Sequence, residues 1–158
     1  MKDLYSVVHI PEPVLSNKTQ PIIDPLEHSI QELIPAMFAT MHKAHGIGLA
    51  APQIGIDKSI AVIEIKQKRY VLINPVLSSV SDEKILFDEG CLSIPGKEFP
   101  IVRSNNVTVR YLDENGKKCK IKTDGLLAIA LQHEIDHLNG IVIADRYEQQ
   151  EHPRELFE

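Results

Sequence analysis

Apolar residues recur at helical spacing in the first third of the chain. They stand three or four positions apart between about residues 26 and 41, as on one face of an α-helix. The segment before them carries the elements of a capping box, namely Asp24, Pro25 and Glu27. The pattern predicts an N-terminal helix over residues 25–44. Pro35 would kink or split it, because proline removes one helical hydrogen bond.

The middle of the chain is rich in segments with the alternation and composition of β-strands. The predicted strands cover residues 59–66, 69–74, 76–80, 84–87, 106–112 and 118–122. Asn115-Gly116 lies between the last two and is a strong hairpin signal. Since the strands follow one another, with helices before and after them, we expect an α+β fold rather than a wound parallel sheet.

A second helical pattern runs from about residue 124 to 138. Asp124 can cap its beginning, and Asn139-Gly140 can end it in a left-handed turn. Its apolar stripe continues directly into two histidines, so that one face carries Leu126, Ile129, Ala130, His133 and His137. Both imidazoles should therefore lie toward the interior. Residues 143–158 are expected to form a short C-terminal tail.

The composition narrows the classes of protein to be considered. The 158 residues are 43% hydrophobic and 25% charged, which is typical of a globular protein and suits one domain over residues 1–158. Two cysteines are too few for a disulfide scaffold. The net charge of -5 makes specific nucleic-acid binding a poor expectation. No segment approaches the roughly 18 apolar residues of a membrane span, and the N-terminus has no signal-peptide pattern, so a cytoplasmic protein with free thiols is expected. We also expect the protein to be a monomer.

The pattern His-Glu-x-x-His on the second predicted helix is the strongest chemical signal. His133 and His137 are one helical turn apart, so both imidazoles can reach one metal ion. Glu134 lies beside them, where a carboxylate can take a proton from water. The alternative is a pair of core histidines whose hydrogen bonds are satisfied by their neighbours.

A catalytic metal site usually has three protein ligands, and the residues alone leave the third one open. Carboxylates downstream of the histidines are one source, namely Asp145, Glu148 and Glu151. The other is Cys91, which lies between Gly90 and a Pro-Gly turn and whose thiolate would be a strong ligand. Cys119 alternates with lysines on a predicted strand and is interpreted as structural.

A glycine-rich segment, Gly46–Gly55, follows the first helix. Its small residues would let a ligand lie against the backbone, and the Gln53 amide could donate to an oxyanion. Alone this signal is weak, because such segments also serve as helix caps and tight bends.

Together three segments resemble the peptide deformylase family, whose members remove the N-formyl group from nascent polypeptides. The segments match its motifs G-x-G-L-A-A-x-Q, E-G-C-L-S and Q-H-E-x-D-H, and they are Gly46–Gln53, Glu89–Ser93 and Gln132–His137. The similarity extends over about residues 4–145. It implies an α+β fold in which antiparallel sheets surround the helix that carries the histidines.

The resemblance also implies ligands and roles. Cys91, His133 and His137 become the metal ligands, with Fe²⁺ as the physiological ion and Zn²⁺, Ni²⁺ or Co²⁺ as frequent substitutes. Glu134 becomes the proton acceptor, and the Gln53 side chain and the Leu92 backbone N–H become the oxyanion donors. The substrate is then an N-formylmethionyl peptide, and its cleft and methionine pocket are formed by Ile47, Gly48, Phe87, Leu126, Ile129 and Ala130. The alternative for the three helical residues is plain core packing.

Two features depart from the family pattern. Glu98 places an acid near the expected cleft, where many members have a non-acidic residue. The segment Tyr147–Glu158 is short and acidic, which argues against docking on the ribosome through this tail. Two rival functions are a zinc peptidase that uses a downstream carboxylate and a binding protein without turnover. An intact Glu134 argues against the second.

Overall fold

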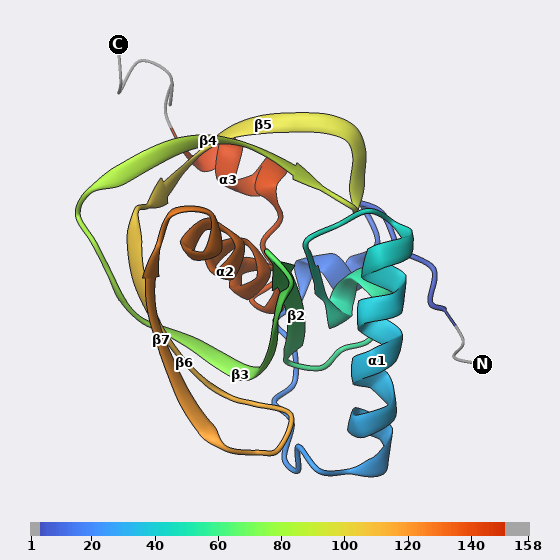
Figure 1. The fold of residues 1–158 in the computed structure, drawn as a ribbon. Helices are drawn as coiled ribbons and strands as arrows, with labels where there is room; N and C mark the ends of the chain where they lie inside the picture. Colours follow the sequence, from blue (N-terminus) through green and yellow to red (C-terminus); the bar gives the residue numbers. More distant parts are fainter. Residues whose placement is uncertain (1–3, 151–158) are drawn as a thin grey trace.

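The computed structural model describes residues 4–150 of the chain and confirms the α+β class (Figure 1). Its helices are η1 (Pro13–Ser16, 3-10), α1 (His28–Lys43), η2 (Ala51–Ile54, 3-10), α2 (Gly125–Leu138) and α3 (Ile143–Gln149). Its strands are β1 (Gly48–Ala50), β2 (Ile60–Ile65), β3 (Lys68–Val80), β4 (Lys84–Cys91), β5 (Ile94–Ser104), β6 (Asn106–Leu112) and β7 (Lys118–Asp124). They form a five-stranded antiparallel sheet in the order β1-β2-β3-β6-β7 and a two-stranded sheet, β4-β5.

Helix α1 begins three residues later than predicted. The Asp24 side chain accepts a hydrogen bond from the backbone of Leu26, at 3.0 Å, and so stabilises a turn ahead of the helix instead of capping it. Pro35 lies inside α1 and does not split it. The apolar face of the helix is buried against the sheet, and this packing outweighs the loss of one hydrogen bond.

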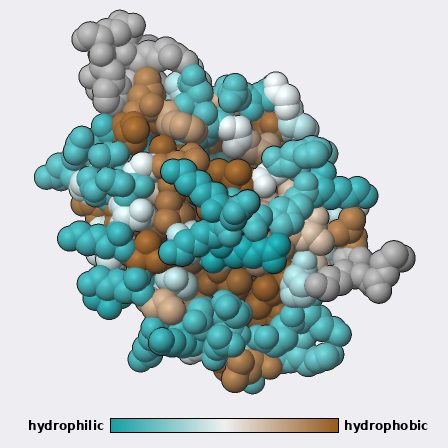
Figure 2. All heavy atoms as spheres, viewed as in Figure 1, coloured by the Kyte–Doolittle hydropathy of each residue, from teal (hydrophilic) through white to brown (hydrophobic). Residues whose placement is uncertain are grey.

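The large sheet is covered by α1 on part of one face and by α2 on the other. Alternate residues of β2 show this directly, since Ile60 and Val62 pack in the cluster with α1, and Ile63 packs in the cluster with α2. In Figure 1 α2 lies inside the curve of β3, β6 and β7, with α1 outside it. Hydrophilic residues cover most of the outer surface in the same view (Figure 2).

The segments predicted as two strands, 69–74 and 76–80, form the single strand β3. Its pairing with β6 shifts register between Ile73 and Val76, and again between Leu77 and Ser79. Asn74 has a positive φ of 50° at the first irregularity. The interruption by Asn74 and Pro75 explains why the sequence pattern reads as two strands.

The β4-β5 hairpin is the main element that the sequence pattern underestimates. β4 continues four residues beyond its predicted end at Phe87, and β5 was not predicted at all. Pro95 and Pro100 argue against a strand in the sequence pattern of β5. Prolines are tolerated here because each strand of a two-stranded sheet has a free edge. The tight connection pairs Cys91 with Ile94, so the cysteine lies at the tip of the hairpin.

Helix α2 agrees closely with its predicted range of 124–138. Asp124 stands at the N-cap position but makes no side-chain capping bond, which corrects that prediction. Gly140 adopts the predicted left-handed conformation, with φ 77°, and the Ile141 N–H reaches the Asp136 carbonyl at 2.9 Å. Every residue from Ala128 to Leu138 is buried, so both histidines lie inside the protein as expected.

The beginning of the expected tail is an ordered helix. Residues 143–149 form α3, which packs on β5 through Ile143 and through Tyr147, whose ring lies 5.5 Å from that of Phe99. The remainder of the predicted acidic tail, residues 151–158, lies outside the described residues. Within residues 4–150 no helix is long and apolar enough to cross a membrane.

Candidate metal centre

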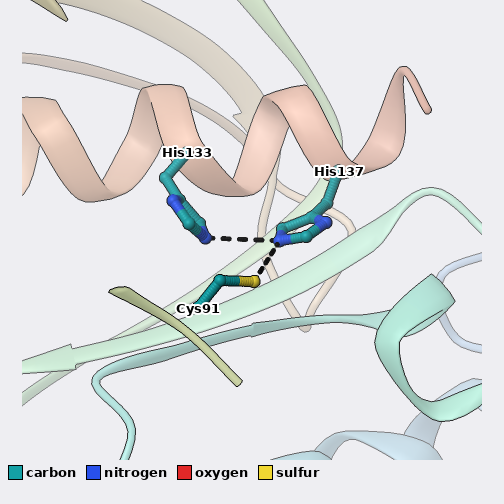
Figure 3. A group of neighbouring side chains, drawn as sticks. All are labelled: Cys91, His133 and His137. Carbon is teal, nitrogen blue, oxygen red and sulfur yellow. Dashed lines mark hydrogen bonds between the residues drawn. The ribbon is translucent and has the colours of Figure 1, made fainter. Parts of the chain in front are cut away.

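Cys91, His133 and His137 converge although they come from two separate elements (Figure 3). The Cys91 Sγ atom lies 3.3 Å from Nε2 of His137, and this Nε2 lies 3.2 Å from Nε2 of His133. All three ligand atoms lie within 4.8 Å of one another. The hairpin tip therefore brings a thiol to the histidine pair of α2.

Hydrogen bonding orients the two imidazoles differently. Nδ1 of His133 lies 2.9 Å from Oε1 of Glu89, a buried side chain of β4. Because a carboxylate only accepts, Nδ1 carries the proton, and Nε2 is the nitrogen that faces the other candidate ligands. Nδ1 of His137 is buried and has no hydrogen-bond partner among the described residues.

This group suits a divalent transition metal. Metal–ligand bonds of about 2.0–2.3 Å in a tetrahedral arrangement separate neighbouring ligand atoms by roughly 3.3–3.6 Å. The separations of 3.2 Å between the two Nε2 atoms and 3.3 Å between Sγ of Cys91 and Nε2 of His137 are close to these values. One thiolate and two imidazoles are donors that bind Zn²⁺, Fe²⁺ and related ions well.

The alternative carboxylate ligands are not part of this group. Asp145 accepts a hydrogen bond from the Val142 backbone at 3.1 Å and so stabilises the first turn of α3. Glu148 is not in the cluster of possible ligands, and Glu151 lies outside the described residues. Cys119 lies elsewhere, on β7, with its Sγ atom 3.7 Å from a carboxylate oxygen of Asp113.

Glu134 places a buried carboxyl group next to the candidate ligands. Its side chain is 4% exposed, and Oε1 has no hydrogen-bond partner among the described residues. Oε2 faces Gly48 of β1, where a Cβ atom would lie only 2.5 Å away. Burial raises the pKa of Glu134 to about 7, more than the charge of His133 lowers it. The carboxyl can therefore exchange a proton near neutral pH.

Gln53 of η2 directs its amide toward the same group. Its Oε1 accepts a hydrogen bond from the Ala50 backbone at 2.9 Å, which fixes the orientation of the side chain. Its Nε2 contacts Ser93 Oγ at 3.3 Å and Cys91 Sγ at 3.6 Å. The amide nitrogen of Gln53 therefore points toward the candidate metal centre.

A cavity of about 820 Å³ opens onto these residues. Glu134, Gln53, Cys91 and Leu92 line it. The residues predicted to bind substrate also line it, namely Ile47, Gly48, Phe87, Leu126, Ile129 and Ala130. Three of these are large apolar side chains that remain 38–46% exposed, which suits an apolar ligand. Ala130 also packs in the core, so its two interpretations are compatible.

The sequence analysis missed the charged residues that support the histidines. Glu89 and Asp136 lie within recognised motifs but received no role, and Arg103 lies on the unpredicted strand β5. Arg103 donates to both oxygens of Glu89, at 2.7 and 2.9 Å. Burial alone would raise the pKa of Glu89, but the hydrogen bonds from Arg103 and His133 outweigh it and hold this pKa below its usual value. The signal available in the sequence was an Arg directly after the apolar run Phe99–Val102.

These features define an α+β protein with the site of a hydrolase: a Cys–His–His group and a buried carboxyl at the floor of an apolar cavity. Comparison with known proteins gives the family. The sequence profile described as polypeptide deformylase matches residues 4–153, and the chain belongs to this family.

Similar proteins agree over most of the chain. A peptide deformylase of Thermodesulfovibrio yellowstonii is 46% identical over 141 residues, which cover 86% of this chain and 84% of that protein. The crystal structure of the Ehrlichia chaffeensis peptide deformylase in complex with actinonin has a TM-score of 0.89 and 39% identity, covering 98% of this chain and 93% of the other. A Met-Ala-Ser-bound class I type b peptide deformylase from Acinetobacter baumannii has a TM-score of 0.89 and 31% identity, covering 92% and 99%.

Proposed function

We propose that this protein is a metal-dependent amidase that hydrolyses the N-formyl group of N-formylmethionyl peptides and releases formate. The observation that carries the proposal is the buried carboxyl of Glu134 beside the Cys–His–His group, at the floor of an apolar cavity. Family membership supports the reaction. The structure of the Acinetobacter relative has Met-Ala-Ser bound, which supports a substrate that begins with methionine.

Cys91, His133 and His137 would hold one metal ion per chain. We propose Fe²⁺ as the physiological ion, with Zn²⁺, Ni²⁺ or Co²⁺ as substitutes. A cation bound there would polarise the formyl carbonyl and make a water molecule more acidic. The protonated Nδ1 of His133, held by Glu89, keeps the metal-facing nitrogen of this residue free to bind.

Glu134 would move the proton of the reaction. Its carboxylate accepts a proton from the attacking water and then donates it to the leaving amine of the peptide. The environment suits both steps, because burial raises the pKa of this group to about 7. The C–N bond of the formamide breaks, and the peptide leaves with a free amino terminus.

Gln53 and Leu92 would stabilise the oxyanion that forms on the formyl oxygen when water attacks the formyl carbon. The amide Nε2 of Gln53 is held in place by the bond of Oε1 to the Ala50 backbone, so little reorganisation is needed during the reaction. The backbone N–H of Leu92, the residue after Cys91, would be the second donor. Both residues line the cavity.

The methionine side chain would occupy the apolar part of the cavity. Ile129 and Ala130 are buried on α2, whereas Ile47, Phe87 and Leu126 are partly exposed around them. A long, flexible thioether side chain fills such an irregular apolar space well. The backbone of Ile47 and Gly48 would lie along the peptide.

The proposed substrate also suggests where the protein works. Formylated nascent chains arise during translation, so we expect a cytoplasmic monomer that acts near the ribosome. Docking through the short acidic tail is not expected, nor is a specific contact with nucleic acid or with a membrane.

The test is formate release from a formyl-Met peptide by protein loaded anaerobically with Fe²⁺ or Ni²⁺. We expect Glu134→Ala to lose activity by a factor of about 10²–10⁴ while it keeps its metal, with Glu148→Ala as the matched control at wild-type activity. Cys91→Ser should lose the metal that Glu148→Ala retains. The proposal is refuted if the loaded wild type releases no formate above buffer, or if Glu134→Ala matches it. In a zinc peptidase that uses Glu148 as its third ligand, Cys91→Ser would keep its metal and Glu148→Ala would lose it.

A further inference from the structure

A chain of buried charges connects the outer helix α3 with the candidate metal ligand His133. Arg146 of α3 donates to both oxygens of Asp136, from Nε at 2.9 Å and from Nη2 at 2.6 Å. Asp136 accepts in addition from Nη1 of Arg103 at 2.6 Å. Arg103 donates to Glu89 through its two other nitrogen atoms, Nε and Nη2, and Glu89 accepts from Nδ1 of His133 at 2.9 Å.

With His133 neutral, as metal binding requires, the charges in this chain balance only when Arg146 is present. Arg103, Glu89 and Asp136 are each 7% exposed or less. Two carboxylates and one guanidinium would leave one buried negative charge without compensation, which is costly in the protein interior. Arg146 supplies the missing positive charge from the surface, where 40% of its side chain remains exposed.

Arg146 also decides how Arg103 is shared between the two carboxylates. Arg103 directs two donors to Glu89 and one to Asp136. Without Arg146, Asp136 would lose two of its three charged donors and would compete more strongly for Arg103. Glu89 would then be held less firmly, and so would the imidazole of His133.

Helix α3 is fixed well enough to transmit this effect. Ile143 packs in the cluster that contains Ile101 of β5. Gln150, just after the helix, accepts a hydrogen bond from the Val102 backbone at 3.0 Å and donates to the Pro100 carbonyl at 2.6 Å. Arg146 therefore reaches the network from a rigid support.

We propose that Arg146 is a positioning residue that orients His133 for metal binding through Asp136, Arg103 and Glu89. The inference rests on the proposed function, because it requires that His133 binds a metal. Outer partners of a metal-binding histidine raise the basicity of its ligand nitrogen and fix its ring, and their loss commonly weakens metal affinity. Arg146 extends this support from the site to helix α3.

The experiment measures Zn²⁺ affinity by competition with a chelator in the full-length protein. Arg146→Met keeps the length of the side chain and removes its charge, and we expect an affinity about tenfold weaker than that of the wild type. Arg146→Lys should lose less, because it restores the charge but not the two-pronged contact. Arg69→Met removes an arginine from the exposed pair with Glu64 and should leave the affinity unchanged.

Two further measurements separate positioning from plain stability. The proton on Nδ1 of His133, followed by NMR of the ¹⁵N-labelled protein, should exchange faster in Arg146→Met. In an Asp136→Asn background, Arg146→Met should change the Zn²⁺ affinity little, since the connection is already broken.

The outcomes distinguish this inference from the proposed function. A wild type that binds no Zn²⁺ overturns the proposed function. A wild type that binds it, together with an Arg146→Met variant of equal affinity and equal His133 proton exchange, overturns only the role of Arg146, even if that variant melts earlier. Equal effects of Arg146→Met in both backgrounds overturn the path through Asp136. If Arg146→Met does not fold, the same measurements are made on Arg146→Lys, and a Zn²⁺ affinity and a His133 proton exchange equal to those of the wild type overturn the role of Arg146.

Discussion

Replacing Gly48 by alanine should inactivate the protein without unfolding it. The added Cβ atom would lie 2.5 Å from Oε2, 3.0 Å from Cδ and 3.3 Å from Cγ of Glu134. An ordinary contact begins near 3.4 Å, so the carboxylate would have to retreat by roughly 0.9 Å. Glu134 is buried on α2 and lines the cavity, so its carboxylate can make room only by leaving the position that it holds against Gly48.

The size of the effect follows from this displacement. A misplacement of about 1 Å in a reacting group costs about a hundredfold in rate. Overpacking by one methyl group costs about 1–3 kcal/mol of stability. We therefore expect kcat/KM for a formyl-Met peptide to fall about a hundredfold, with the loss mainly in kcat, while the protein stays folded and retains its metal.

The matched control is Gly90→Ala, next to the candidate ligand Cys91. A Cβ atom there meets nothing closer than 3.9 Å, so this variant should keep most of its activity. The assay compares formate release, metal content and thermal unfolding of both variants with the wild type. Wild-type kcat/KM in Gly48→Ala would refute the reasoning, and so would a loss of activity that merely follows a loss of fold or of metal.

Three other predictions concern the base, the ion network and the pocket. Burial raises the pKa of Glu134 to about 7, and the carboxylate must be ionised to accept a proton, so kcat/KM should fall as the pH drops through this region. A nearby cation would place this fall at or below about pH 7. A fall in kcat/KM that begins well above pH 7 would contradict this assignment. Arg103→Met leaves two buried carboxylates without their shared partner, and it should lower the free energy of unfolding by about 3–5 kcal/mol. Urea denaturation at pH 7 measures this loss, and a loss below about 1 kcal/mol would show that the network is dispensable for stability. Phe87→Ala removes an aromatic ring from the cavity wall and should reduce the preference for formyl-Met over formyl-Ala peptides about tenfold, through KM; an unchanged preference would exclude this ring from the methionine pocket.

The residues that sequence patterns predicted well are those whose structure depends on their near neighbours. The range of α2, the left-handed turn at Gly140 and the hairpin around Asn115-Gly116 follow from local periodicity and turn chemistry. The placement of His133 and His137 on one buried face follows from helical spacing alone. The family resemblance added the expected ligand set, because its motifs name residues that lie far apart in the chain.

Other features became clear only from the tertiary structure, because they depend on contacts between distant segments. The residues alone left Cys91 and the downstream carboxylates as equal ligands, and the choice depends on the β4-β5 hairpin, which carries the thiol to a histidine 46 positions away. Strand β5 contains prolines, which by local propensity favour a loop. Pairing with β4 nevertheless stabilises it as a strand and brings Arg103 to Glu89. Composition and spacing indicate most of the elements that form. How these elements pack decides which charges meet, and burial then sets the pKa of Glu134 and makes the partners of His133 matter.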